Sequence, residues 1–88
     1  MDPKIQQMIA KEVAKRVHES VEGGDEPEEF VQKMLSGGYP PMIIQAIAGM
    51  SDDEVLAGIK QAEPNSAGTT PRGQRFVHAA LAALRAAI

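Results

Sequence analysis

Residues 40–62 read PPMIIQAIAGMSDDEVLAGIKQA, and this stretch decides the fold class. Ser51 and Glu54 at its centre form a capping box, in which each side chain hydrogen-bonds the backbone amide at the other's position. The box predicts the start of a helix that ends before Pro64, because proline lacks an amide donor and cannot continue a helix. The apolar run before the box, from Pro41 to Gly49, predicts a short helix of its own.

Helix start and stop signals recur toward the N-terminus. Asp2 followed by Pro3 predicts a first helix, and we expect it to end at the glycine pair at positions 23 and 24. Pro27 predicts the start of a second, short helix that ends at the glycine pair at positions 37 and 38. Both helices are therefore expected to be joined to their neighbours by short turns.

The C-terminal part of the chain begins with a segment of turn-forming residues. Residues 63–70 contain proline, asparagine, serine and glycine without periodicity, so we expect an exposed loop there. Thr70 followed by Pro71 predicts the start of the last helix, which runs to Ile88. The sequence contains no run of alternating β-branched or aromatic residues, so no strand is predicted. The sequence therefore predicts an all-α fold, a single helical domain over residues 1–88 built as a compact bundle of about five short helices with no sheet.

Apolar residues at helical spacing predict the core. In the first helix they recur every fourth residue from Ile5 to Val21, which exceeds the helical period, so the apolar stripe drifts and suits a neighbour that crosses steeply. In the second helix we expect Val31 and Leu35 to be buried as well. The principal core residues we expect are Ile9, Val13, Val17, Phe30, Met34, Ile43, Ile47, Leu56, Ile59, Phe76, Leu81 and Leu84.

Composition limits the classes of function. The chain has 88 residues and a net charge of −3, the wrong sign overall for a protein that binds phosphate backbones. Cysteine is absent, so the disulfides that stabilise small secreted domains are missing. No apolar run approaches the roughly 18 residues that a membrane span needs, and the N-terminus lacks the apolar stretch of a signal peptide. We therefore expect a cytoplasmic protein that does not enter a membrane.

Groups suited to catalysis or metal binding are scarce. His18 and Glu22 lie four residues apart, as ordinary pairs on exposed helices often do, and His78 is expected on the surface of the last helix. No calcium-loop pattern, paired-histidine pattern or phosphate-binding glycine loop is present. We therefore expect no catalytic residue, no metal ligand, no cofactor and no small-molecule substrate, and we interpret the protein as not an enzyme.

The first candidate interface lies in the apolar segment before the capping box, where Gln45 is the only polar residue between Pro40 and Met50. A helix that is apolar on nearly all sides is normally buried, so this segment is in the first place a candidate for the central core helix. Its apolar side chains nevertheless point in more directions than one neighbour covers, and flexible methionine is common at adaptable binding surfaces. The residues we expect at such a protein interface are Tyr39, Met42, Ile44 and Met50.

The second candidate interface is a face of the last helix that carries only small side chains. Ala79, Ala82 and Ala86 lie side by side on this face and would let another helix approach closely. That helix is either the first helix of the same chain or the last helix of a second copy, which would make the protein a homodimer. Alanine is also the best helix former, so helix propensity alone explains the same residues.

The basic start of the last helix supports an alternative function. Thr70, Arg72 and Arg75 place a hydroxyl and two guanidinium groups at a helix N-terminus, where phosphate binds favourably. The alanine-rich helix that follows offers few side chains that read bases, so nucleic acid is the less favoured partner. The sequence therefore predicts a non-enzymatic helical module for protein–protein interaction or oligomerisation, which binds another protein or itself. A small nucleic-acid-binding domain is the alternative.

Overall fold

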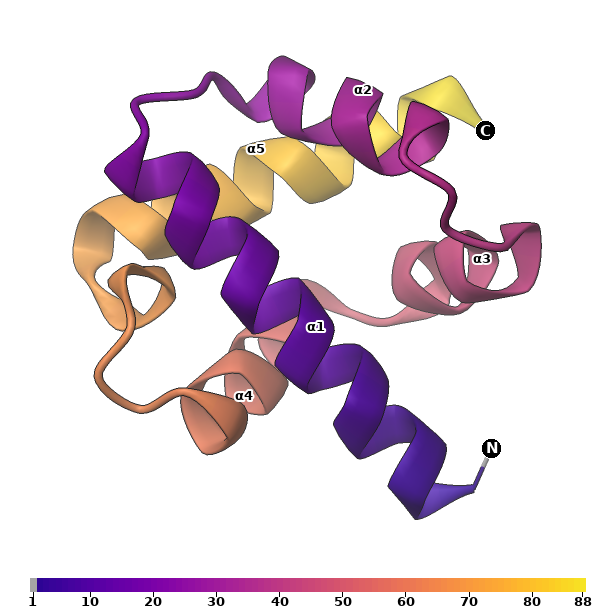
Figure 1. Cartoon of the computed structure of the whole chain (residues 1–88), viewed down its shortest axis with the longest axis horizontal. Helices are drawn as coiled ribbons and strands as arrows, with labels where there is room; N and C mark the ends of the chain where they lie inside the picture. Colours follow the sequence, from indigo (N-terminus) through magenta and orange to yellow (C-terminus); the bar gives the residue numbers. More distant parts are fainter. Residues whose placement is uncertain (1) are drawn as a thin grey trace.

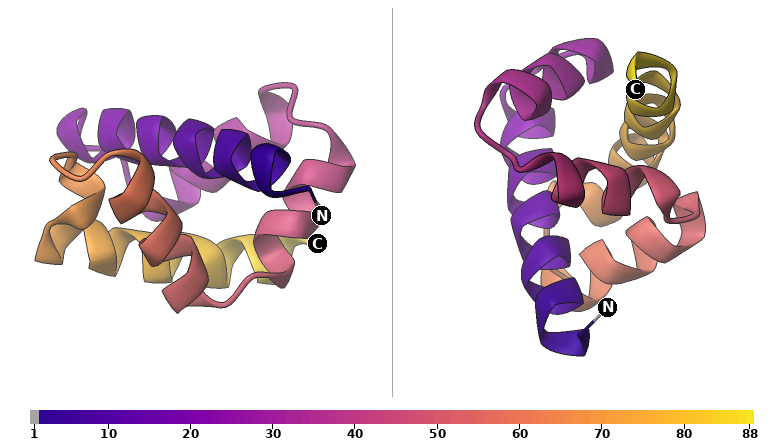
Figure 2. Two further views of the ribbon diagram at one scale, coloured as in Figure 1. Left: turned by 90° about the horizontal axis from the view of Figure 1, so that it is seen from below. Right: turned by 90° about the vertical axis from the view of Figure 1, so that its right-hand side faces the viewer.

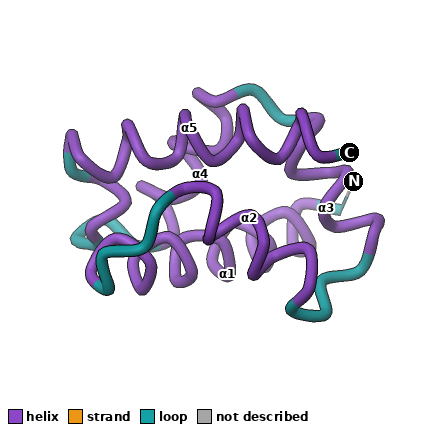
Figure 3. The backbone as a smooth tube through the Cα atoms, turned by 90° about the horizontal axis from the view of Figure 1, so that it is seen from above, coloured by secondary structure: helices purple, strands orange, loops and turns teal. Residues whose placement is uncertain are grey.

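The computed structural model describes residues 2–88, and this part of the chain is helical without any strand (Figure 3). The all-α prediction is confirmed, with five α-helices and one 3-10 turn joined by short connections. Among these residues, no helix is both long enough and apolar enough to cross a membrane. The elements are α1 Pro3–Glu22, α2 Pro27–Ser36, α3 Pro41–Gly49, α4 Asp52–Ala62, η1 Ala67–Thr69 and α5 Pro71–Ala87.

The helices form a bundle with steep crossings rather than a parallel array. α1 runs diagonally across the front and α5 crosses behind it, with α2 alongside α5 (Figure 1). α4 packs mainly on α1, and η1 lies between α1, α4 and α5. α3 lies at one end of the molecule, where its main packing partner is α5 (Figures 1 and 2). The drifting stripe of α1 is consistent with these steep crossings.

Local capping interactions fix the helix starts where the sequence predicts them. The Asp2 carboxylate accepts the Lys4 amide at 2.8 Å. Both hydrogen bonds of the capping box are present at 3.2 Å, from the Glu54 amide to Ser51 Oγ and from the Ser51 amide to Glu54 Oε1. The turns after α1 and α2 contain Gly24 at φ 76° and Gly38 at φ 89°, the left-handed conformation that glycine adopts without strain.

The buried residues form one hydrophobic core, which contains an edge-to-face pair of the rings of Phe30 and Phe76, with centroids 5.5 Å apart. Ile9, Ile43 and Leu56 were predicted to be buried and are only partly so. The prediction for Leu35 is wrong, because this side chain is 37% exposed on the outer side of α2. The fully or largely buried hydrophobic residues are Val13, Ala14, Val17, Val21, Phe30, Val31, Met34, Ile44, Ile47, Val55, Ile59, Ala67, Phe76, Val77, Ala80, Leu81 and Leu84.

The segment before α5 is not the exposed loop that its composition predicts. Ser66, Ala67 and Gly68 are buried, and η1 turns here between three helices. A Cβ atom on Gly73 would lie 2.7 Å from the Gly68 Cα and would collide with the Ala67 carbonyl oxygen. Small residues therefore allow the backbone of η1 to touch the backbone of α5, which a scan for turn formers does not detect.

Truncation of Phe76 tests the core. Phe76→Ala removes a buried ring that contacts Phe30, so we expect the free energy of unfolding to fall by about 3–5 kcal/mol. Such a loss unfolds much of a domain of this size at room temperature. Chemical denaturation followed by circular dichroism measures it. A variant that unfolds at the wild-type midpoint would contradict the assignment of Phe76 to the core.

Two glycines on helices are expected to respond to alanine with opposite signs. Gly73→Ala forces a Cβ against the backbone of η1, and we expect the free energy of unfolding to fall by about 1–3 kcal/mol. Gly49→Ala meets no atom within 4 Å, and we expect a gain of roughly 0.5 kcal/mol because the unfolded chain loses conformational freedom. Thermal unfolding of both variants checks the pair. Equal shifts would contradict the close contact of η1 with α5.

Candidate protein interface

The N-terminal half of α1 carries apolar side chains that the bundle does not cover. α1 has 20 residues and is therefore about 30 Å long, as long as the largest dimension of the molecule at 29 Å. Its N-terminal end projects away from the other helices (Figure 1). Ile5 is 46% exposed and Met8 is 71% exposed. Ile5 falls on the apolar stripe that was predicted to face the core, but the stripe is packed against the core only from Ile9 onward.

α3 is part core and part surface. Ile44 and Ile47 face the interior and are buried, whereas Met42 is 81% exposed. The segment therefore contributes to both the core and the surface, and its role as an interface stays a prediction. Ile44 is the exception among the predicted interface residues, because it belongs to the hydrophobic core and is not available to a partner.

Two adjoining hollows lie where α1 meets α3. The outer hollow has a volume of about 240 Å³, and the inner hollow, which α4 also borders, has a volume of about 270 Å³. Ile9 and Val13 line both. The remaining lining residues are Ile5, Met8, Glu12, Tyr39 and Ile43 in the outer hollow, and Gln6, Ala10, Gln45, Ala46, Ile47, Gly49, Met50, Glu54, Val55, Gly58 and Ile59 in the inner hollow.

These features define a continuous candidate interface. We call it the α1–α3 surface, and it consists of the two hollows together with Met42, which shares a helix face with Gln45 and Gly49 of the inner hollow. Among the residues predicted from the sequence, Tyr39 lines the outer hollow and Met50 the inner one. The contribution of α1 was missed, since a helical stripe does not show where its neighbours end.

Tyr39 is anchored to α1 at the edge of the outer hollow. Its hydroxyl donates to Glu12 Oε1 at 3.4 Å, and the Arg16 guanidinium lies 5.7 Å from the centre of its ring. Burial, with the nearby Glu12 carboxylate, raises the pKa of Tyr39, so the phenol stays protonated at neutral pH. Arg16 Nε also donates to Glu12 at 3.1 Å. The ring is thereby held in place before any partner binds.

A polar cluster that the sequence analysis missed attaches the end of α3 to α5. Arg85 donates from Nη2 to the Met50 carbonyl at 2.7 Å, from Nε to the Ala48 carbonyl at 3.1 Å and from Nη1 to Asp52 Oδ1 at 2.8 Å. His78 lies on the surface of α5, as predicted, and its Nδ1 lies 2.5 Å from Asp52 Oδ2. Hydrogen bonds from His78 and Arg85 lower the pKa of Asp52, which keeps this carboxylate ionised well into acid.

The small-residue face of α5 lies open. Ala79, Ala82 and Ala86 are all exposed, and α1 does not cover them. Of the two partners considered from the sequence, the first helix of the same chain is therefore wrong for this face. A second copy stays a prediction.

The start of α5 offers less to a phosphate than the sequence analysis expected. The Thr70 hydroxyl donates to the Ala67 carbonyl at 2.6 Å and accepts the Gly73 amide at 3.0 Å, so its one proton is already engaged inside the protein. Arg72 and Arg75 are exposed and form no ion pair within residues 2–88. Of the three groups predicted to bind phosphate, the two guanidinium groups are therefore available and the hydroxyl is not.

His18 makes a contact that links two distant segments of the chain. Its Nδ1 accepts the Ala67 amide at 2.8 Å, so the ring holds η1 against α1 and is not an exposed partner of Glu22. In residues 2–88, no group of three or more histidine, aspartate or glutamate side chains is placed to hold a metal ion.

Comparisons with family models, with curated proteins and with solved structures find no match to this chain. Among the described residues, two hollows and the exposed methionines together form an apolar surface.

Removal of the Arg85 side chain is expected to weaken the attachment of α3 to α5. Arg85→Ala deletes three hydrogen bonds, and because the side chain is partly exposed we expect a loss of only about 1 kcal/mol in the free energy of unfolding. Hydrogen exchange should accelerate in α3 more than in α2. Arg75→Ala, a matched change on the same helix at a residue without an ion pair, should leave α3 unchanged. Equal exchange rates in both variants would contradict a role of Arg85 in holding α3.

Proposed function

We propose that this protein is a non-enzymatic helical interaction module that binds another protein, or a second copy of itself, through the α1–α3 surface. The observation that carries the proposal is the exposure of two large apolar side chains, Met8 at 71% and Met42 at 81%, beside two apolar hollows. Contiguous exposed apolar patches on soluble domains usually mark interaction sites. Methionine suits this role because its unbranched side chain adapts to different partners.

A cytoplasmic location is part of the proposal. The chain contains no cysteine, whereas small secreted domains commonly depend on disulfides for stability. Oligomerisation through Ala79, Ala82 and Ala86 is a second form of the same function, and the exposure of all three residues favours it.

Nucleic-acid binding is the alternative function, and the exposed pair Arg72 and Arg75 favours it. Binding of this kind weakens steeply as salt rises, because phosphate contacts release counterions. An apolar protein interface responds far less to salt.

Site-specific photo-crosslinking in the source cell tests the proposal. A photoreactive amino acid is introduced in separate variants at positions 42, 82 and 72, with position 60 as an exposed control on α4. We expect discrete protein adducts from position 42 and none from position 60. An adduct of twice the 9.4 kDa mass from position 82 would identify the homodimer.

The same experiment contains the results that would contradict the proposal. Adducts with nucleic acid from position 72, together with none from position 42, would contradict binding through the α1–α3 surface and favour the alternative function, nucleic-acid binding. Equal adduct patterns from positions 42 and 60 would show that the contacts at position 42 are not specific.

A further inference from the structure

The two acidic side chains that line the α1–α3 surface, Glu12 and Glu54, are engaged inside the protein, and so is Asp2 at the start of α1. Asp2 caps α1 through the Lys4 amide, and Glu54 accepts the Ser51 amide in the capping box. Glu12 accepts hydrogen bonds from Arg16 and Tyr39. Their charges are therefore partly neutralised, or directed toward helix N-termini that attract negative charge.

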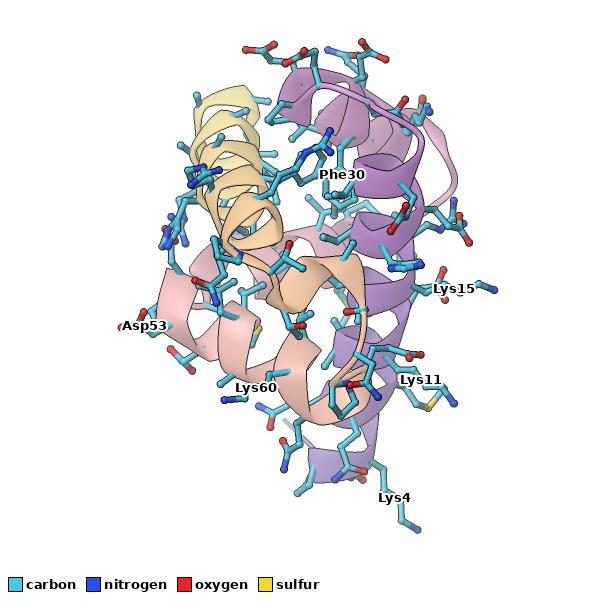
Figure 4. All side chains as sticks on the ribbon, turned by 90° about the vertical axis from the view of Figure 1, so that its left-hand side faces the viewer. Lys4, Lys11, Lys15, Phe30, Asp53 and Lys60 are labelled. Atoms are coloured by element: carbon cyan, nitrogen blue, oxygen red, sulfur yellow. The ribbon has the colours of Figure 1, made fainter. Side chains whose placement is uncertain are left out.

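The lysines that neighbour Met8 on α1 line neither hollow and have no such partners. Lys4, Lys11 and Lys15 form no ion pair within residues 2–88. Lys4 and Lys11 lie four residues before and three residues after Met8, so they flank it on one face of α1. All three side chains project from the same edge of α1, and Asp53 lies on the far side of the molecule (Figure 4). We call Lys4, Lys11 and Lys15 the lysine row.

We propose that the α1–α3 surface binds an amphipathic helix of a partner protein, which inserts apolar side chains into the two hollows and presents acidic side chains to the lysine row. This inference rests on the proposed function and adds the chemistry of the partner. A groove between helices suits the apolar face of another helix, whose side chains recur at a spacing of three or four residues. The charge beside the groove then selects partners with acidic flanks, mainly through the rate of association.

The concave shape favours a helix over an anionic membrane. Ile9, Val13 and Ile43 are recessed and at most partly exposed, so inserted side chains reach them, whereas a flat lipid surface would contact only the protruding Met8 and Met42. The open face of α5 in a second copy is also a poor fit, because it carries arginines and alanines and the sequence after Glu63 contains no acid. A different protein with an acidic amphipathic helix supplies both the apolar side chains that enter the hollows and the acids that face the lysine row.

The test uses two fluorescein-labelled synthetic peptides that form the same amphipathic helix. Both carry leucines at helical spacing, and they differ only in having glutamates or lysines beside the leucine face. We expect the full chain to bind the glutamate peptide about tenfold more tightly than the lysine peptide at low salt, since three exposed ion pairs contribute modestly. The difference should shrink at high salt. Fluorescence anisotropy measures both affinities.

Matched variants separate the two parts of the site. Lys11→Glu should weaken binding of the glutamate peptide about threefold or more, whereas Lys60→Glu, the same change on α4 outside the hollows, should not. Met8→Ser should weaken both peptides about fivefold without a change in stability, because this side chain is 71% exposed. Leu35→Ser, at an exposed apolar residue of α2, should weaken neither.

The outcomes distinguish this inference from the proposed function. No binding of either peptide, or equal affinity for both, overturns the acidic helix, while protein adducts from position 42 in cells would leave the interaction module standing. Vesicles of phosphatidylcholine and phosphatidylglycerol test whether the protein binds an anionic membrane instead. Binding to these vesicles that Lys11→Glu abolishes, without preference for the glutamate peptide, would overturn the inference in favour of a lipid surface.

Discussion

The contact between η1 and the start of α5 is the constraint on which the bundle depends. A Cβ atom on Gly68 would lie 2.9 Å from Ile59 Cγ2 of α4 and 3.4 Å from Val17 Cγ1 of α1, and a Cβ atom on Gly73 would lie 2.7 Å from the Gly68 Cα, so neither glycine has room for a side chain. His18 accepts the Ala67 amide, which adds a polar link from α1. One turn of 3-10 helix thereby contacts α1, α4 and α5 at a single junction.

The position of this junction explains why the opposite end of the molecule is open. The junction holds the C-terminal half of α1, whereas the first turns of α1, before Ala10 meets Gly58 of α4, extend past the neighbouring helices and leave Met8 exposed. α3 lies at the same end, packs mainly on α5 and receives most of its polar attachment from Arg85. A chain of 88 residues cannot cover both helices, because a small domain buries only about 60–65% of its unfolded surface. The candidate interface is thus a result of the same packing that forms the core.

The parts of the structure that the sequence predicted are those fixed by local chemistry. The capping box at Ser51 and the glycine turns act over a few residues, so their effect can be predicted without knowing the neighbours. The errors arise from contacts between distant segments. His18 and Ala67 are 49 residues apart, and Asp52 and Arg85 are 33 apart. The candidate interface likewise has a part that the sequence predicts and a part that it does not. The apolar character of α3 follows from composition, whereas the exposure of Met8 and the burial of Ile44 depend on where other helices end.

The charges at the candidate interface show why the net charge of the chain is a poor guide to the charge of its partner. The chain has a net charge of −3, which by itself disfavours an acidic partner. The acids nearest the interface are nevertheless used in caps and in the contact of Glu12 with Arg16 and Tyr39. Exposed charges separated by more than about 10 Å are largely screened, so the distant acids at the start of α2 contribute little to the field beside Met8. A partner at this surface therefore encounters an apolar groove with a positive edge.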